Sequence, residues 1–239
     1  MLASFAGSDN RHPVLGRGDG IGMSDTGGRR PTGDQIGQLV IPSTCAVLVQ
    51  EMQNGVVGPE SGLPMLAEAA AAANLVEHVV QVVQAARMAR VTVVHCTAEN
   101  LENGFGANRN ARLFAMARRA GLANQPGTDS VKPIPVLGPE SGDVVLPRYH
   151  GLSPMCGSPL DQLLRNSGVS TVVVVGVSLN IAIPNLVFDA VNRSYQVVVV
   201  SDAVAGTPVE FGTQVLTHSL SLVATIVTSE QLVAAWSAS

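Results

Sequence analysis

Charged, lysine and aromatic side chains are all scarce in this sequence. Charged residues make up 13% of the 239 positions and aromatic residues 3%, whereas an average soluble domain is about 25% charged. The low charge content suggests that contacts between subunits hide further surface. The net charge of −4 gives no electrostatic case for a nucleic acid or an anionic membrane as partner. Lys132 is the only lysine, so a catalytic lysine would have a single candidate.

Cysteines and the common cofactor motifs are sparse or missing as well. The three cysteines form no CxxC pair and no spacing typical of a metal site: Cys45, Cys96 and Cys156. The GxGxxG, P-loop and HExxH motifs do not occur, so dinucleotide, nucleotide and zinc-protease functions lose their main support. We therefore expect neither a metal nor a cofactor.

Long apolar runs are also missing. None reaches the ~18 residues that a membrane-spanning helix needs, and the N-terminus lacks the apolar stretch of a signal peptide. The sparse, unpaired cysteines agree with a reducing compartment. We expect a soluble, cytoplasmic protein.

Composition divides the chain into two segments. Residues 1–36 are rich in Gly, Asp, Arg, Ser and Pro and show no hydrophobic period, which is typical of an extended arm. Residues 37–239 contain enough apolar sequence to form one well-buried domain.

Apolar, β-rich runs alternate with helical patterns along this domain. Strands are expected at 44–50, 91–96, 143–147, 171–176, 196–201 and 224–228. Helices are expected at 63–89, 107–120, 158–167, 180–193, 209–222 and 229–237. The strands are continuous Val, Ile and Leu runs, as in a parallel sheet that is covered on both faces. The pattern predicts an α/β fold, a three-layer doubly wound sandwich with a six-stranded, mainly parallel, Rossmann-like sheet.

The first strand ends in a carboxylic acid. Glu51 follows the run "AVLVQ", and Gln53 lies two residues further along. A carboxylate at the end of a buried strand is costly unless it serves a purpose. Glu51 is therefore a candidate acid or base, the alternative being an acid that caps a turn, and Gln53 is a candidate substrate contact.

The third strand leads into a second candidate segment, "LPRYHGLSPMCG". Leu146 and Arg148 point the same way if the strand stays extended across Pro147. Arg148 and His150 are candidate catalytic residues, and Tyr149 a candidate substrate contact. Cys156 lies near a helix start that would favour a thiolate, although a small packed thiol is the simpler interpretation.

The third candidate segment is the turn "GVSLNIA" after the fourth strand. Backbone N–H groups around Val177 and Ser178 are placed to face an anion or oxyanion. Asn180 is either a substrate contact or the N-cap of the next helix. His95, on the second strand, is interpreted as a packed core histidine.

Together these segments resemble the isochorismatase-like cysteine hydrolase superfamily. The resemblance runs from about residue 40 to 237 and rests on "AVLVQEMQN", "DVVLPRYHGLSPMCGSPLDQLLRNSGVSTVVVVGVS" and "DAVNRSYQVVVVSDAVAG". It implies an isochorismatase-like fold. It also implies catalysis by an Asp, a Lys and a Cys, in which the Asp deprotonates the Cys and the Cys attacks an amide.

The three catalytic positions of that superfamily are altered here. Glu51 stands at the Asp position, Leu146 at the Lys position and Ala182 at the Cys position. Since a methyl group cannot attack a carbonyl, thiolate chemistry by the family's route is excluded. The metal ligands of the nicotinamidase branch are not recognisable either.

Two functions follow as expectations. One is a hydrolase acting on a small organic acid, amide or vinyl ether through Glu51, whose burial among Leu146, Ala182 and valines would hold it protonated as an acid. In that hydrolase Arg148 or His150 would replace the lysine as the charged partner of Glu51 and hold a substrate carboxylate. The other is a catalytically inactive member that binds a small molecule or serves in an oligomeric assembly.

The expected partners are a small-molecule ligand and further copies of the same chain. Members of the superfamily are commonly oligomeric, and the low charge content agrees, so we expect a homo-oligomer with the N-terminal arm at an interface. Light scattering at micromolar concentration should therefore give a mass of at least twice 24.7 kDa; a monomeric mass would contradict the expectation.

Overall fold

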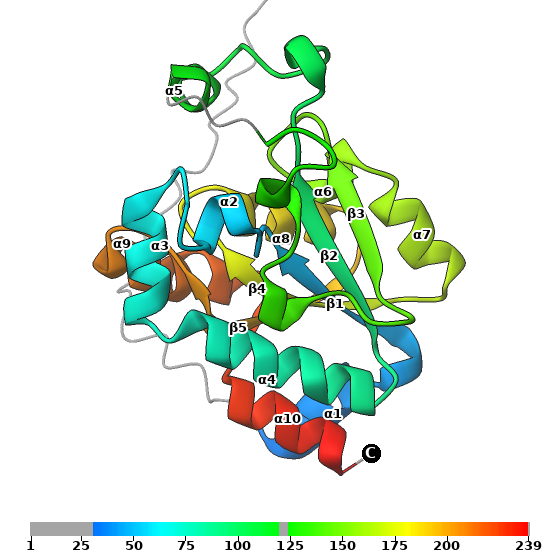
Figure 1. Cartoon of the computed structure of the whole chain (residues 1–239). Coiled ribbons are helices and arrows are strands. Elements are labelled where there is room, and N and C mark those ends of the chain that lie inside the picture. The colour runs from blue at the N-terminus through cyan, green and yellow to red at the C-terminus, as the bar shows by residue number, and fades with distance from the viewer. Residues whose placement is uncertain (1–30, 120–123, 239) are drawn as a thin grey trace, which may run out of the picture. The chain divides into compact units, whose positions relative to one another are not determined.

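Six parallel strands form the centre of the domain (Figure 1). The structure is a computed structural model that describes residues 31–119 and 124–238, so most of the expected N-terminal arm lies outside the described residues. The strands are β1 Cys45–Gln50, β2 Thr92–Ala98, β3 Val144–Arg148, β4 Thr171–Val177, β5 Gln196–Ala205 and β6 Thr225–Val227. Their order is β3-β2-β1-β4-β5-β6, and every pairing between neighbours is parallel.

The described helices lie between and around these strands. The α-helices are α1 Gly33–Leu39, α2 Asn54–Val57, α3 Pro64–Ala72, α4 Leu75–Met88, α5 Arg112–Arg119, α6 Pro154–Gly157, α7 Leu160–Asn166, α8 Ala182–Asn192, α9 Val209–His218 and α10 Ser229–Ser237. Short 3-10 helices span Pro42–Thr44, Glu102–Gly104, Asp129–Val131, Pro135–Leu137 and Leu220–Leu222.

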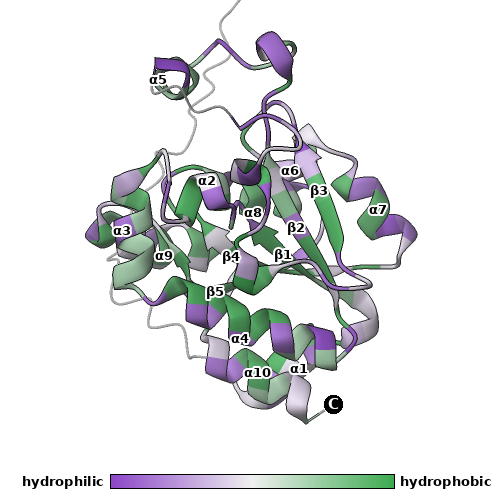
Figure 2. Ribbon diagram, viewed as in Figure 1, coloured by the Kyte–Doolittle hydropathy of each residue, from purple (hydrophilic) through white to green (hydrophobic). Residues whose placement is uncertain are grey.

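Helices cover both faces of the sheet and so create two apolar cores. Alternate strand residues pack on one side against α1, α3, α4 and α10. The other alternation packs against α6, α7 and α8. Burial on both faces explains why β1 and β4 are apolar along most of their length, as Figure 2 shows for the centre of the sheet. The predicted three-layer α/β fold is confirmed.

The structure differs from the expected helix pattern at residues 63–89. The helix expected at 63–89 is two helices, α3 and α4, which meet at 69° where Asn74 has a left-handed φ of 49°. No single described helix is long and apolar enough to cross a membrane, although the combined length and composition of this bent pair would suffice.

The last residues of the expected arm belong to the folded domain. Thr32 and Gln35 form a capping box that starts α1, and Ile36 is 1% exposed. The indole N–H of Trp236 in α10 donates to the carbonyl of Val40, at 2.9 Å. The boundary expected at residue 36 therefore falls inside α1.

A buried charged network joins α4 to the start of β3. Asp143 accepts hydrogen bonds from Arg87 Nη2 at 2.5 Å and from the backbone N–H of Glu140 at 3.0 Å. His95 Nε2 lies 3.3 Å from the same carboxylate, and its side chain is 2% exposed, as expected for a packed histidine. Burial lowers the pKa of His95 below 6.5, against the opposing effect of Asp143.

The lowered pKa of His95 makes stability depend on pH. Because the unfolded chain protonates this imidazole at a higher pH than the folded chain does, the unfolded state binds more protons as the pH falls through 6.5. We expect the free energy of unfolding to decrease between pH 7.5 and 5.5, and this decrease to be smaller in His95→Gln. Urea titrations measure it, with the exposed His150→Gln as control; equal slopes in wild type and His95→Gln would contradict it.

Candidate active site

The site lies where the chain reverses its direction across the sheet. Strands β1, β2 and β3 extend the sheet one way, and β4 then returns to pair with the other side of β1. In open α/β sheets, ligands bind at the carboxyl ends of the strands beside such a switch point. The three candidate segments follow β1, β3 and β4, so all of them reach this edge.

Glu51 leaves β1 in an unusual backbone conformation and forms an ion pair with Arg148. Its φ of 51° is left-handed, and its N–H donates to the carbonyl of Cys96 at 2.9 Å. Its Oε1 accepts hydrogen bonds from Arg148 Nη2 and from Gln50 Nε2, the latter at 2.8 Å. The Glu51 and Arg148 side chains are 15% and 12% exposed. A non-glycine residue at positive φ often marks a functional position.

The surroundings of Glu51 differ from the apolar ones that the sequence led us to expect. Apolar neighbours would favour the protonated acid, whereas an adjacent guanidinium and an amide donor stabilise a carboxylate. The physical reason is that Arg148, two residues beyond the lysine position, occupies the space beside the acid. The acid is therefore paired with a positive charge instead of lying among apolar side chains.

Arg148 is fixed from its other side by the loop that follows β3. Its Nη1 donates to the carbonyl of Gly151 at 2.7 Å, and the N–H of Gly151 donates to Asn108 Oδ1 at 2.7 Å. Its Nε is buried without a hydrogen-bond partner. Leu146, at the lysine position, is 8% exposed and packs in the core that contains α7 and α8.

The turn after β4 approaches β1 very closely. A Cβ on Gly176 would lie 2.2 Å from the carbonyl oxygen of Gln50, and φ is 105° there, so this position requires glycine. The peptide bond between Val177 and Ser178 is cis. Val177 is fully buried and Ser178 partly buried. Ala182, 7% exposed, is the first residue of α8.

Two predicted substrate contacts use their amides to hold the backbone. Gln53 is fully buried; its Oε1 accepts from the N–H of Ala98 at 2.6 Å, and its Nε2 donates to the carbonyl of Ala98 at 3.1 Å. Asn180 makes the same two-way contact with Thr207, at 2.9 and 2.6 Å. Asn180 is not the N-cap of α8, which is Ile181. The interpretation of Asn180 as a cap is wrong because its amide is bound to another loop.

Tyr149 and His150 are not joined to Glu51. Tyr149 is partly buried and His150 exposed. Across residues 31–119 and 124–238, no hydrogen bond or ion pair connects either side chain with the acid. The ion pair thus brings together only two of the three predicted catalytic residues.

Two polar residues at this edge escaped the sequence reasoning. Gln50 is fully buried and donates to Glu51, and Glu99 follows β2. Burial raises the pKa of Glu99, although the Thr97 hydroxyl donates to it at 3.2 Å. The signal available in the sequence was a polar residue at the end of an apolar strand in both cases.

None of the three cysteines takes the place of the missing nucleophile. Burial raises the pKa of Cys96, beside Glu51 and Arg148, to about 12, and that of Cys45 to about 12 as well. Cys156 is exposed rather than packed as expected. It donates to Asp189 at 3.2 Å and accepts from Arg193 Nη2 at 3.3 Å, away from the ion pair.

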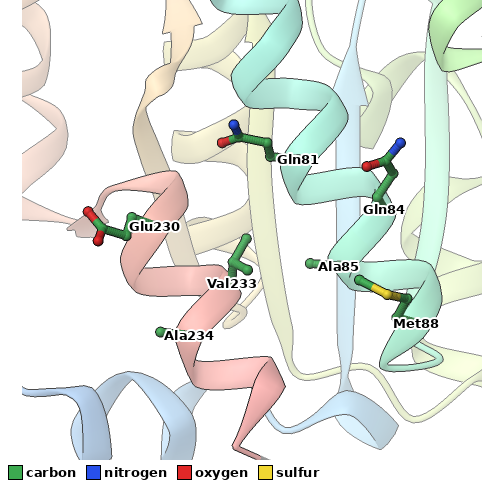
Figure 3. A pocket seen from close by; sticks show the side chains of 7 residues that line it. All are labelled: Gln81, Gln84, Ala85, Met88, Glu230, Val233 and Ala234. Atoms are coloured by element: carbon green, nitrogen blue, oxygen red, sulfur yellow. The ribbon is translucent and has the colours of Figure 1, made fainter.

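In the described part of the chain, neither a metal-binding cluster nor the groove between α4 and α10 involves the predicted site residues. Within the described ranges, no group of three His, Cys, Asp or Glu side chains is arranged to hold a metal ion. A surface groove of about 590 Å³ runs between α4 and α10 (Figure 3). Its lining contains none of the predicted site residues: Gln81, Gln84, Ala85, Met88, Glu230, Val233 and Ala234.

The exposure of the thiols predicts which of them reacts. In the native protein, iodoacetamide should modify Cys156 and leave Cys45 and Cys96 unmodified, because the latter two are buried and held as thiols. Intact-mass spectrometry would show one adduct in the native state and three after denaturation. Cys156→Ser should give no native adduct. Labelling of Cys96 in the native protein would contradict the prediction, because it would show a reactive thiol beside Glu51 and Arg148.

Comparisons with known proteins agree with this architecture. A family model for the isochorismatase domain matches residues 45–231. The chain is 29% identical over 186 residues to the ureidoacrylate amidohydrolase RutB of Methylorubrum extorquens, covering 69% of this chain and 72% of that protein.

Solved structures share the fold. A cysteine hydrolase from Pseudomonas syringae superposes with a TM-score of 0.71 at 22% identity, covering 84% of this chain and 95% of that one. An isochorismatase family protein from Desulfovibrio vulgaris has a TM-score of 0.69 at 26% identity, with 79% and 96% covered. Since the family model spans most of the chain, this protein belongs to the isochorismatase family.

Proposed function

We propose that this protein is a hydrolase of a small organic acid, amide or vinyl ether that works by acid/base catalysis through Glu51 without a cysteine nucleophile. The observation that carries the proposal is the Glu51–Arg148 ion pair at the carboxyl edge of the sheet. Ala182, the first residue of α8, holds the position that the family resemblance assigns to the thiol. A partly buried carboxylate at the carboxyl edge of an open α/β sheet is a candidate for chemistry.

The bonding of Glu51 indicates how it would act. Oε1 accepts two hydrogen bonds, whereas Oε2 has no partner among the described residues. Oε2 is then free to take a proton from a water molecule, whose oxygen forms the new bond to the substrate carbon. For an amide, the C–N bond breaks next and Glu51 returns the proton to the leaving nitrogen.

The turn after β4 supplies the second element of this mechanism. At the start of α8, the N–H of Ala182 has no acceptor among the described residues, whereas the N–H of Ile183 donates to the carbonyl of Ser178 at 3.0 Å and Pro184 has no N–H. N–H groups at a helix N-terminus stabilise negative charge, as on the oxygen of a tetrahedral intermediate. An N–H group in this position would also orient a bound ligand that the protein does not cleave.

An amide suits this site better than a vinyl ether. Vinyl ether cleavage starts with protonation of a carbon and needs an acid, whereas the ion pair favours a carboxylate at Glu51. A carboxylate that activates water is suited to attack on a carbonyl carbon. The amidohydrolase name of the relatives points in the same direction.

The second candidate is a non-catalytic member that binds a small molecule. Ala182 and Leu146 favour it, because the two side chains that they replace supply the thiol and the amine of the family's reaction. The two functions share the same site and differ in whether a bound amide is cleaved.

Replacing Glu51 by Gln tests the proposal. We expect a screen of small amides, ureides and carboxylates to find hydrolysis by the wild type, and kcat/KM to fall at least about 100-fold in Glu51→Gln, because the base is lost while the shape is kept. Glu230→Gln, an exposed acid on α10, is the matched control. Unchanged hydrolysis in Glu51→Gln would refute the proposal, and binding without cleavage by the wild type would favour the non-catalytic function.

A further inference from the structure

Gln50 is the one polar residue in β1 and is completely buried. The other five residues of the strand are apolar, from Cys45 to Val49. A fully buried side-chain amide is costly unless its donor and acceptor are satisfied. A leucine or valine would pack there without that penalty, so the amide calls for an explanation.

The hydrogen bonds of Gln50 are made on one side only. Nε2 donates to Glu51 Oε1 at 2.8 Å, while Oε1 of Gln50 is buried without a partner. This orientation secures a donor for the carboxylate and leaves an acceptor unsatisfied. The amide is therefore arranged around Glu51 rather than around its own hydrogen-bonding needs.

Gln50 also lies in the same row of the sheet as the lost lysine. Gln50 is paired with Cys96 across the β1–β2 ladder, and Cys96 with Leu146 across the β2–β3 ladder. Cys96 and Leu146 pack in the same apolar core, so both side chains lie on one face of the sheet. Alternation along β1 places Gln50 on this face too, since Ala46 and Leu48 belong to that core.

Arg148 and Gln50 thus bring two donors to one carboxylate oxygen. Arg148 reaches it from β3, and Gln50 reaches it from the neighbouring position on β1. Both donors stabilise the ionised form of the acid, and with Oε1 occupied, Oε2 is left as the oxygen that can accept a proton.

We propose that Gln50 is a positioning residue that, together with Arg148, replaces the missing lysine by holding Glu51 as a carboxylate with Oε2 free. This inference rests on the proposed function of Glu51 as a base. It extends that function by assigning a role to a residue that does not touch the substrate.

The proton affinity of Glu51 tests this role directly and needs no substrate. Gln50→Met keeps the volume but removes the donor, and we expect the proton affinity of Glu51 to rise about tenfold, since the neutral form is then less disfavoured. Carbon-13 NMR of glutamate carboxyls in the full-length chain measures the titration, and the Glu51→Gln spectrum identifies the Glu51 signal.

Two further variants keep the test decisive. Gln84→Met, on the exposed side of α4, makes the same change away from the site and should leave the Glu51 titration unchanged. Gln50→Asn shortens the side chain by one methylene, which withdraws its donor from Oε1, so it should also raise the proton affinity and replaces Gln50→Met if that variant does not fold. A change of less than twofold in the folded Gln50 variants would overturn the inference.

Activity gives a second, separable measurement. For any substrate that wild type hydrolyses, Gln50→Met should lower kcat about tenfold at neutral pH, move the acidic limb of the pH profile to higher pH and change KM less than twofold. If no substrate is found, the proposed function fails while a shifted titration still supports Gln50 as the positioning residue. If Glu51-dependent hydrolysis is found but the titration and the pH profile are unchanged, only the role of Gln50 is overturned.

Discussion

The ion pair between Glu51 and Arg148 determines what the carboxyl edge of this sheet is able to do. The two residues come from β1 and β3, which β2 separates, so their contact exists only because the strands are ordered as observed. Both side chains are mostly buried, and removing either would leave the other charge without its partner in a poorly solvated position. The left-handed backbone at Glu51 and the carbonyl of Gly151 complete the geometry that brings the two groups together.

Around this pair, the positions to which the family resemblance assigns the catalytic residues hold other side chains. The positions of the thiol and the amine hold Ala182 and Leu146, and the neighbouring Cys96 is buried and held as a thiol. Arg148, two residues beyond the lysine position, places a positive charge beside the acid. The acid keeps two donors in a mostly buried position, Arg148 and Gln50. This is why water, activated by the carboxylate, takes the role of nucleophile in the proposed mechanism.

The fold was largely predictable from the sequence, whereas the site was predictable only in part. Continuous Val runs mark β1 and β4 because both faces of these strands are covered, and the end of the run at Gln50 places Glu51 at the edge. The amides of Gln53 and Asn180 were expected to face substrate, yet they bind backbone 45 and 27 residues away. Such contacts depend on which loops the fold brings together, and no local pattern encodes them. The partner of Glu51, 97 residues distant, was expected as either Arg148 or His150, and only the fold decides that it is Arg148.

The side-chain amides of Gln53 and Asn180 are bound to backbone, which limits the groups that can take part in chemistry at the site. Gln53 fixes the end of β2, Asn180 fixes the turn after β4 to the loop after β5, and Gly176 lets β4 approach β1 closely. These contacts make the edge rigid, which a reaction without a covalent intermediate requires because water and substrate must both be oriented by fixed groups. They also remove the amides from the set of groups that can take part in chemistry. What remains is one carboxylate oxygen of Glu51 without a partner among the described residues, the group to which the proposed function assigns proton transfer to and from a water molecule.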